Sequence, residues 1–293
     1  MKRLGAGPPL LFFLCLGLGL SCRASDQDVA VVLSSNLEPY QEALKGFQES
    51  FGRTAPVFIL AEGRPRLPAG TRLVVAIGSK ASLFPYPQDT MLIYCMAPGV
   101  QVPKGRRNAI KIHTVPATLS VLSKIKQIQP SLRTLGVLWG SDAIEDFLSD
   151  RALVESSLGI KLAADRIRSV DDLPDRLRAL KGKVDALWLP PDPLLVTPAA
   201  FAVLQDYSTG NRIPVYASAE TLIEDGAVAS LFSSYQEIGR RAGWAAQRVL
   251  EGTLERTAYY PEKLQIAVNP SRAREVGLTI PPNIAKEAVP SAP

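Results

Sequence analysis

The chain has 293 residues, of which 46% are hydrophobic, and its formal net charge is +5. This apolar content excludes an intrinsically disordered chain, and the length exceeds that of one typical hydrophobic core, so two lobes can form.

The first 24 residues predict a signal peptide, because Lys2 and Arg3 precede an apolar stretch that is too short to span a bilayer. Two processing routes fit the sequence: cleavage after Ala24, and cleavage before a lipidated Cys22. Removal of the leader takes away Lys2, Arg3 and Arg23 without any acid, which lowers the net charge from +5 to +2. No basic stretch then favours nucleic acid as a partner. We expect an exported, periplasmic protein, with a membrane anchor at Cys22 as an open alternative.

The chain has too few cysteines and histidines for most metal-binding or catalytic sites. With Cys15 in the leader and Cys22 at its edge, Cys95 is left without a disulfide partner and is interpreted as a buried, inert thiol. His113, the one histidine, is interpreted as a structural or rim residue. No metal site is expected from this set.

Short apolar stretches that end in turn residues alternate with amphipathic stretches along the chain. The first strand is predicted over Val29–Leu33, and the first helix over 39–51, with Gly52 as its stop. Further strands are predicted over 57–60, 73–77, 91–96, 109–112, 134–139, 160–167, 186–189, 215–217, 227–231 and 264–268. Further helices are predicted over 116–129, 173–180, 198–207 and 235–250. One more helix is predicted between the turn at 140–142 and residue 158. This alternation predicts two consecutive α/β modules with parallel sheets.

The last of these helices carries Gly239 and Gly243 four residues apart. Glycine lowers helix propensity, so the pair indicates a close approach to a neighbouring element.

Hydroxyl side chains recur where the predicted strands end. They are Ser34, Ser35, Ser79, Ser141, Ser218, Ser233 and Ser234. The carboxyl ends of parallel strands form the edge at which ligands bind, and free amides at a helix start together with a hydroxyl favour an anionic group. Each serine also fits an ordinary helix cap. Their common placement in both modules favours a ligand site.

Asp192 follows a predicted buried strand and lies among Pro190, Pro191 and Pro193. Such a fixed carboxylate suits a ligand ammonium group, and it equally suits a turn-forming aspartate. Aromatic residues near the strand ends fit either core positions or the wall of a ligand site. These are Tyr40, Trp139, Trp188, Tyr216 and Tyr235.

Common catalytic motifs are absent from the sequence. No GxxxxGK[ST], GxGxxG, HExxH, CxxC or GxSxG pattern occurs, which argues against nucleotide hydrolysis, dinucleotide binding, zinc or serine hydrolysis and redox relays. We therefore expect no catalytic residue, no cofactor and no enzymatic activity.

Several stretches of the second half carry a resemblance to a known family. They are 184–192, 213–217, 226–230, 235–240, 250–252, Asn269 and 277–281. In these stretches the chain resembles the ABC-transporter substrate-binding proteins of the type I periplasmic-binding fold. Within them it is most similar to the branch of the tryptophan- and tyrosine-type binding proteins. The similarity covers the mature chain and is strongest from Val184 onward.

This resemblance implies two Rossmann-like lobes with parallel sheets, joined by a three-segment hinge. The N-terminal lobe would comprise 26–115 and 235–258, the C-terminal lobe 116–234 and 259–282, and a flexible tail 283–293. The ligand-facing positions it implies are Ser34, Ser35, Ser79 and Ala97 in the first lobe, Ser141, Asp192 and Ser218 in the second, and Ser234 and Tyr235 at the hinge. The family often has aspartate where this chain has Ser234.

The leading hypothesis is an exported solute-binding protein of an ABC transporter. It would capture a small molecule, such as an amino acid or related carboxylate, and deliver it to the ABC permease in the inner membrane as a monomer. The alternative is a periplasmic sensor or accessory subunit with the same fold and no transported ligand.

Overall fold

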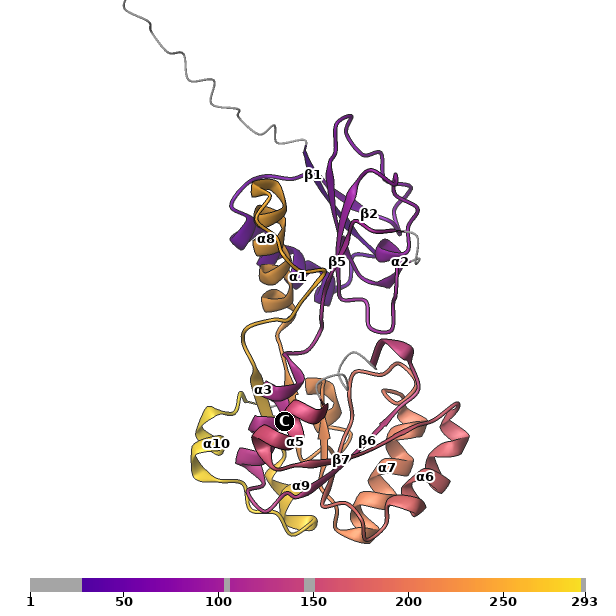
Figure 1. The fold of residues 1–293 in the computed structure, drawn as a ribbon, viewed down its shortest axis with the longest axis vertical. Helices are drawn as coiled ribbons and strands as arrows, with labels where there is room; N and C mark the ends of the chain where they lie inside the picture. Colours follow the sequence, from indigo (N-terminus) through magenta and orange to yellow (C-terminus); the bar gives the residue numbers. More distant parts are fainter. Residues whose placement is uncertain (1–27, 103–105, 145–150, 291–293) are drawn as a thin grey trace, which may run out of the picture.

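The computed structural model describes residues 28–102, 106–144 and 151–290, so the predicted signal peptide and Cys22 lie outside the described residues. Figure 1 shows two lobes stacked along the long axis, and each lobe is built on one six-stranded sheet. This confirms the α/β class with two parallel-sheet lobes. None of the helices within the described ranges combines the length and apolar character that crossing a membrane requires.

The first lobe has an all-parallel sheet in the order β11-β5-β4-β3-β1-β2. The strands are β1 (Val29–Leu33), β2 (Val57–Ile59), β3 (Leu73–Ile77), β4 (Met91–Cys95), β5 (Ala109–Ile112) and β11 (Ala258–Tyr259). The helices are α1 (Glu38–Phe51), α2 (Ser79–Ser82) and α8 (Tyr235–Glu251). Every residue of β1 and β3 is buried, as expected for central strands with both faces covered.

Helices α1 and α8 pack with almost no space between their backbones. A Cβ atom built on Gly239 would lie 1.8 Å from the carbonyl oxygen of Ala43, and one on Gly46 would lie 1.8 Å from that of Gln236. Only glycine fits such contacts. The close approach predicted from Gly239 and Gly243 is confirmed.

The second lobe has the strand order β12-β10-β9-β8-β6-β7, in which β12 alone runs antiparallel to its neighbour. Its strands are β6 (Thr134–Trp139), β7 (Lys161–Arg166), β8 (Ala186–Trp188), β9 (Val215–Ala217), β10 (Ala229–Phe232) and β12 (Gln265–Val268). Its helices are α3 (Thr118–Ile128), α5 (Arg151–Leu158), α6 (Leu173–Leu180), α7 (Pro198–Asn211), α9 (Pro270–Glu275) and α10 (Pro282–Glu287), with 3-10 turns at Asp142–Ile144, Val170–Asp172 and Glu220–Ile223. Trp188 and Tyr216 are fully buried in its core, so these two aromatic residues do not form a ligand wall.

The C-terminal segment differs from the flexible tail expected over 283–293. Residues Pro282–Glu287 form helix α10, and Ile284 is fully buried in the core of the second lobe. The backbone N–H of Val289 donates to the carbonyl of Ile266 at 2.8 Å. Burial of Ile284, this backbone bond and the ion pair of Glu287 with Lys124 at 2.9 Å hold the segment on the second lobe.

The chain passes between the lobes three times, after β5, after β10 and after β11. Two of these crossings are joined, because the Ser233 hydroxyl donates to the carbonyl of Lys263 at 2.7 Å. Tyr259 pairs with Ile112 in the first sheet. The third crossing therefore begins after Tyr259, one residue beyond the expected end of the first-lobe segment.

Candidate functional site

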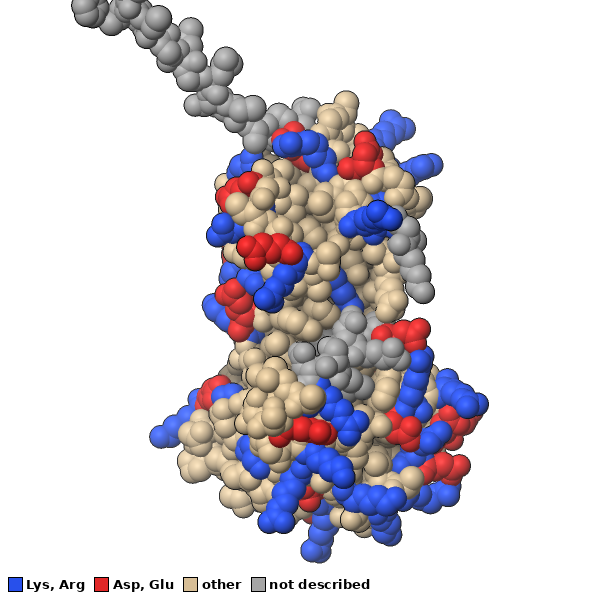
Figure 2. All heavy atoms as spheres, viewed as in Figure 1, with Lys and Arg blue, Asp and Glu red and all other residues tan. Residues whose placement is uncertain are grey.

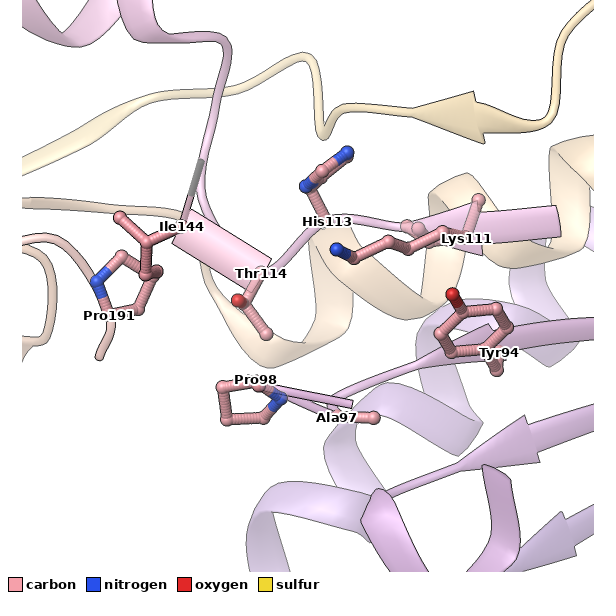
Figure 3. A pocket seen from close by; sticks show the side chains of 10 residues that line it. Tyr94, Ala97, Pro98, Lys111, His113, Thr114, Ile144 and Pro191 are labelled. Atoms are coloured by element: carbon pink, nitrogen blue, oxygen red, sulfur yellow. The ribbon is translucent and has the colours of Figure 1, made fainter. Parts of the chain in front are cut away.

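A small pocket lies between the lobes at the carboxyl ends of β4 and β5 (Figure 3). Its volume is about 20 Å³, which is close to the space that one water molecule needs. An organic ligand therefore requires the pocket to widen. The first lobe and the first crossing contribute Tyr94, Ala97, Pro98, Gly99, Lys111, Ile112, His113 and Thr114, and the second lobe contributes Ile144 and Pro191.

The turn after β4 brings the first lobe to the second. Met96 has φ 53° and Gly99 has φ 74°, and a left-handed conformation is uncommon for a residue other than glycine. A Cβ atom built on Gly99 would lie 3.1 Å from Cγ of Pro193 and 3.5 Å from Oγ of Ser141. Backbone outliers of this kind concentrate at functional sites, so the Met96 conformation supports the pocket as the candidate site.

Strands β4 and β5 present polar side chains to the pocket. Tyr94 and Lys111 are register partners in these neighbouring parallel strands, and both line the pocket. His113 follows β5, and its ring stacks on Tyr260 with centroids 4.2 Å apart and an interplanar angle of 11°. Its backbone N–H donates to the carbonyl of Tyr259 at 2.9 Å, which fixes the residue at the pocket rim.

Sequence reasoning missed Tyr94, Lys111 and Thr114 as pocket residues. One signal was available: Lys111 is a lone charged residue in a short apolar stretch. The interpretation of His113 as a structural or rim residue agrees with its stacking and its 3% exposure.

Asp192 has a different environment from the one predicted. It is fully buried, and its oxygens accept hydrogen bonds from the backbone N–H groups of Gly140 at 2.8 Å, Ser141 at 2.9 Å and Leu194 at 2.8 Å. These bonds use the carboxylate inside the second lobe. This environment agrees with the turn-forming alternative, and the contact with a ligand ammonium stays a prediction.

Besides Ser233, whose hydroxyl donates to the carbonyl of Lys263, three more of the predicted serines bond within the protein. The Ser34 hydroxyl accepts from the N–H of Ala81 at 2.9 Å, and the Ser218 hydroxyl donates to the carbonyl of Leu189 at 2.7 Å. Ser234 caps helix α8 by accepting from the N–H of Glu237 at 3.2 Å. The helix-cap alternative is confirmed for Ser234.

The remaining predicted residues fall into separate parts of the inter-lobe region. Ala97 lines the pocket, and Ser141 lies near Gly99 beside it. Gly78, next to Ser79, lies against Ser34 and Tyr40 at the ends of β1 and β3, and Ser35 is half-buried.

Tyr235 is 40% exposed at the start of α8. Burial, followed by the charges of Glu42 and Glu220, raises the pKa of its phenol above the ordinary value, so the hydroxyl stays protonated at neutral pH. Glu42 belongs to the first lobe and Glu220 to the second, which places Tyr235 between the lobes.

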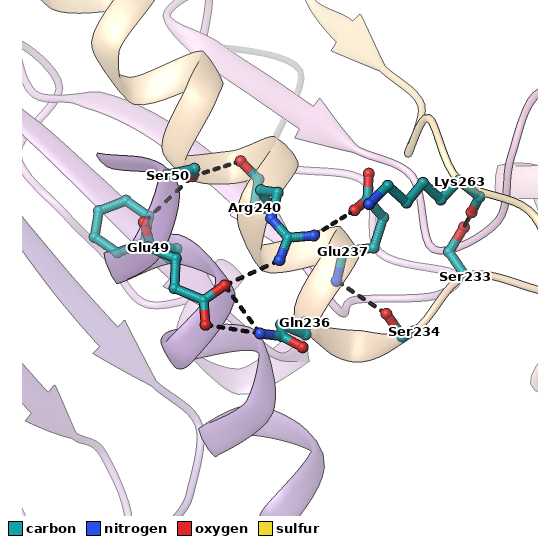
Figure 4. A network of polar contacts seen from close by, with 9 residues as sticks. Glu49, Ser50, Ser233, Ser234, Gln236, Glu237, Arg240 and Lys263 are labelled. Carbon is teal, nitrogen blue, oxygen red and sulfur yellow. Dashed lines mark hydrogen bonds and ion pairs between the residues drawn. The ribbon is translucent and has the colours of Figure 1, made fainter. Parts of the chain in front are cut away.

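A network of polar contacts fixes α8 on α1 next to the hinge (Figure 4). Arg240 donates to Glu49 at 2.9 Å and to Glu237 at 2.9 Å. Two hydrogen bonds raise the pKa of Arg240, and the bond to Glu49 contributes more than the bond to Glu237. The hydrogen bond from Arg240 in turn lowers the pKa of Glu49. The network stabilises the start of α8, directly after the second crossing.

Cys95 ends β4, just behind the pocket. It is a free, buried cysteine, and burial raises the pKa of its thiol to about 12. The interpretation of Cys95 as a buried thiol is confirmed.

A wider groove of about 690 Å³ lies at the opposite edge of the second sheet, and Arg133, Lys181 and Arg212 line it. Figure 2 shows Lys and Arg side chains gathered at this end of the second lobe. Lys181 and Arg212 follow the last residues of α6 and α7, where the helix dipole favours cations. Parallel sheets bind ligands at their carboxyl ends, so the inter-lobe pocket is the stronger candidate site.

The two lobes, their parallel sheets and the pocket between them define a two-lobe α/β binding protein. Residues 116–291 match the model of the family described as "ABC transporter substrate binding protein", and this is more than half of the chain. The chain belongs to this family, which confirms the resemblance found in the sequence.

A stretch of 136 residues is 27% identical to the tyrosine-binding protein of Clostridioides difficile (strain R20291) and covers 45% of this chain and 38% of that relative. Among solved structures, the chain is similar to an ABC domain from Streptococcus pneumonia in complex with L-Trp, with TM-score 0.56, 22% identity and coverage of 89% of this chain and 98% of that one. It is also similar to the ligand-free, open structure of a substrate-binding protein with adhesive properties from Clostridium difficile, with TM-score 0.62, 17% identity and coverage of 89% and 97%. The similarity to these two structures concerns the fold.

Proposed function

We propose that this protein is an exported solute-binding protein that captures a small molecule between its lobes and delivers it to an ABC permease in the inner membrane. The observation that carries this proposal is the pocket that both lobes line at the carboxyl ends of β4 and β5, beside the first crossing. The family assignment supports it. The named ligands of the relatives, tyrosine and L-Trp, favour an amino acid or related carboxylate.

The mechanism follows from the pocket's position. A ligand that contacts both lobes stabilises the arrangement in which they lie together, and this population shift is the signal that the permease reads. The short crossings allow the lobes to move as units, and the Ser233–Lys263 bond keeps two crossings side by side.

The predicted leader supports a periplasmic location. Cleavage after Ala24 and lipidation of Cys22 give mature proteins of different mass. The intact mass of the protein exported by its native host therefore separates the two routes.

The test is thermal unfolding of the purified mature protein in the presence of amino acids, nucleosides and organic acids. A ligand that binds the folded form at 100 times its Kd adds about 2.7 kcal/mol, which raises the Tm of a chain of this size by roughly 5–10 °C. We expect a concentration-dependent rise with an amino acid or related carboxylate. The absence of any shift contradicts the proposal.

A second candidate, a sensor or accessory subunit without a transported ligand, is favoured by one observation. The pocket is about one water in size, and the polar groups of Ser34, Ser218 and Asp192 are engaged inside the protein. This candidate predicts a stably folded protein whose Tm no compound of the panel changes.

A further inference from the structure

We propose that the groove at the amino-terminal edge of the second sheet is a second binding site and that its ligand is a soluble anion with two or more phosphate groups. The groove has a volume of about 690 Å³, which is within the range of small-molecule sites. Its lining comes from three loops, over 129–133, 181–185 and 211–213, all within the described ranges. The inference goes beyond the proposed function, because the inter-lobe pocket lies at the opposite edge of this sheet.

The sheet places the three loops side by side. They lead into β6, β8 and β9, which are neighbouring parallel strands with β8 in the middle. Neighbouring strands are about 4.8 Å apart, so Arg133 before β6 and Arg212 before β9 flank the loop of Lys181, with about 10 Å between the two outer strands. A ligand that contacts both arginines therefore needs anionic groups at two separated positions.

The groove carries an excess of positive charge. Of its lining residues, three are Lys or Arg and one is Asp. Within the described part of the chain, no acid forms an ion pair with the side chains of Arg133, Lys181 or Arg212. The carboxylate of Asp185 accepts hydrogen bonds from the backbone N–H groups of Arg133 at 2.8 Å and Thr134 at 2.7 Å. The guanidinium groups are thus left for a ligand, and their planar geometry suits phosphate oxygens.

The ends of the helices do not by themselves explain these cations. Arg133 lies directly before β6 and outside the last turn of α3, so the helix dipole gives no reason for its charge. Arg212 has φ 52° in the left-handed position after α7, where glycine is the usual residue. The backbone therefore favours glycine at this position, and the advantage of arginine lies in its side chain.

Buried hydrogen bonds fix the base of the groove. The Gln129 side chain is 7% exposed, and its amide donates to the carbonyl of Asp185 at 3.2 Å. Its oxygen accepts from the hydroxyl of Tyr216 at 2.9 Å. The Ser208 hydroxyl donates to the carbonyl of Ile213 at 2.7 Å, which holds the loop of Arg212. Because these bonds are formed without a ligand, less ordering is needed when one binds.

The experiment is isothermal titration of the purified mature protein with tripolyphosphate and with orthophosphate. Salt screens exposed charges, so the titration is done at about 50 mM NaCl. We expect saturable binding of tripolyphosphate, roughly 10-fold or more tighter than that of orthophosphate, which is too short to contact both arginines. Arg133→Gln and Arg212→Gly should each weaken tripolyphosphate binding about 5- to 20-fold. Glycine adopts the left-handed conformation readily, so Arg212→Gly removes the side chain and keeps the loop.

The matched control is Arg274→Gln, which removes an exposed arginine from α9 in the same lobe, outside the groove, and should leave binding unchanged. Absence of tripolyphosphate binding to the wild-type protein overturns the proposal. Binding that neither Arg133→Gln nor Arg212→Gly weakens, or that Arg274→Gln weakens as much, also overturns it. Equal affinity for orthophosphate overturns recognition at two separated positions.

Phosphate groups also occur in lipid head groups, so a second measurement separates the two sources. We expect the protein to stay in solution when phosphatidylglycerol vesicles are sedimented. Sedimentation with these vesicles that Arg133→Gln and Arg212→Gly both abolish would overturn the soluble ligand in favour of a membrane surface. These outcomes leave the proposed capture of a ligand between the lobes intact.

Discussion

The carboxylate of Asp192 accepts a hydrogen bond from the backbone N–H of Ser141 at 2.9 Å, and this bond joins the turn after β8 to the turn after β6. The same oxygen accepts from Gly140 at 2.8 Å, and the other accepts from Leu194 at 2.8 Å. One buried side chain thereby shapes the second-lobe surface that faces Gly99.

Asp192→Ala should destabilise the protein by about 3 kcal/mol, because it leaves these backbone N–H groups without their acceptor. The free energy of unfolding in urea measures the loss. Asp206→Ala, an exposed aspartate on α7, is the matched control and should cost less than about 0.5 kcal/mol. Equal stability of the two variants would contradict the structural role of Asp192.

Gly239→Ala should destabilise the first lobe by about 3 kcal/mol, because its Cβ would lie 1.8 Å from the carbonyl oxygen of Ala43 and would force α8 away from α1. Gly210→Ala is the control: it lies in α7 with nothing within 4 Å of the added Cβ, so it should gain about 0.5–1 kcal/mol from helix propensity. Urea unfolding of both variants gives the comparison. A Gly239→Ala protein as stable as wild type would refute the close packing of α8 on α1.

Alkaline pH should destabilise the protein through Cys95. The pKa of its thiol is about 12 in the folded protein against an ordinary 9.0, so the contribution of the protonated thiol is complete below pH 9 and is lost as pH rises from 9 to 12. Between pH 9 and 10, the free energy of unfolding should fall by about 1 kcal/mol in wild type and by less in Cys95→Ala. Parallel pH profiles for the two proteins would contradict the burial of this thiol.

Arg240→Met should cost about 1–2 kcal/mol, because it leaves the carboxylate of Glu237, a residue that is 5% exposed, without its partner. Adding Glu237→Gln should recover part of that loss, which a double-mutant cycle measures. Arg248→Met serves as the control, since Arg248 forms an exposed pair with Glu251 on the same helix and should cost less than about 0.5 kcal/mol. If the stability losses of the two single variants add up to the loss of the double variant, Arg240 and Glu237 are not coupled.

The strands and helices with strong local patterns were predictable from sequence. Val29–Leu33 and Leu73–Ile77 are continuous apolar stretches, and Gly52 ends α1 in the left-handed conformation. The two residues of β11 were not predicted, because so short a strand has no periodicity and exists through its pairing with β5. Helix α10 was not predicted because its one buried apolar residue, Ile284, lies among prolines and alanines and gives no helical pattern.

The candidate site was predictable in its location and less so in its residues. Sequence placed polar groups at the carboxyl ends of the strands, and the pocket lies there. It did not reveal that Asp192 accepts hydrogen bonds from the backbone N–H groups of Gly140 and Ser141, since these lie in the turn after β6, about 50 residues away in sequence. Lys111 was not predicted to line the pocket, because that position depends on its pairing with Tyr94 on β4 and on the turn after that strand.

The order of the chain has a consequence for biosynthesis. Helix α8 covers α1 and strand β11 completes the first sheet, yet both follow the greater part of the second lobe in sequence. A nascent chain that ends before Tyr235 leaves the face of α1 around Gly46 and Phe47 uncovered. The lobe that begins first is therefore finished late, and the two lobes reach their final form together near the end of translation.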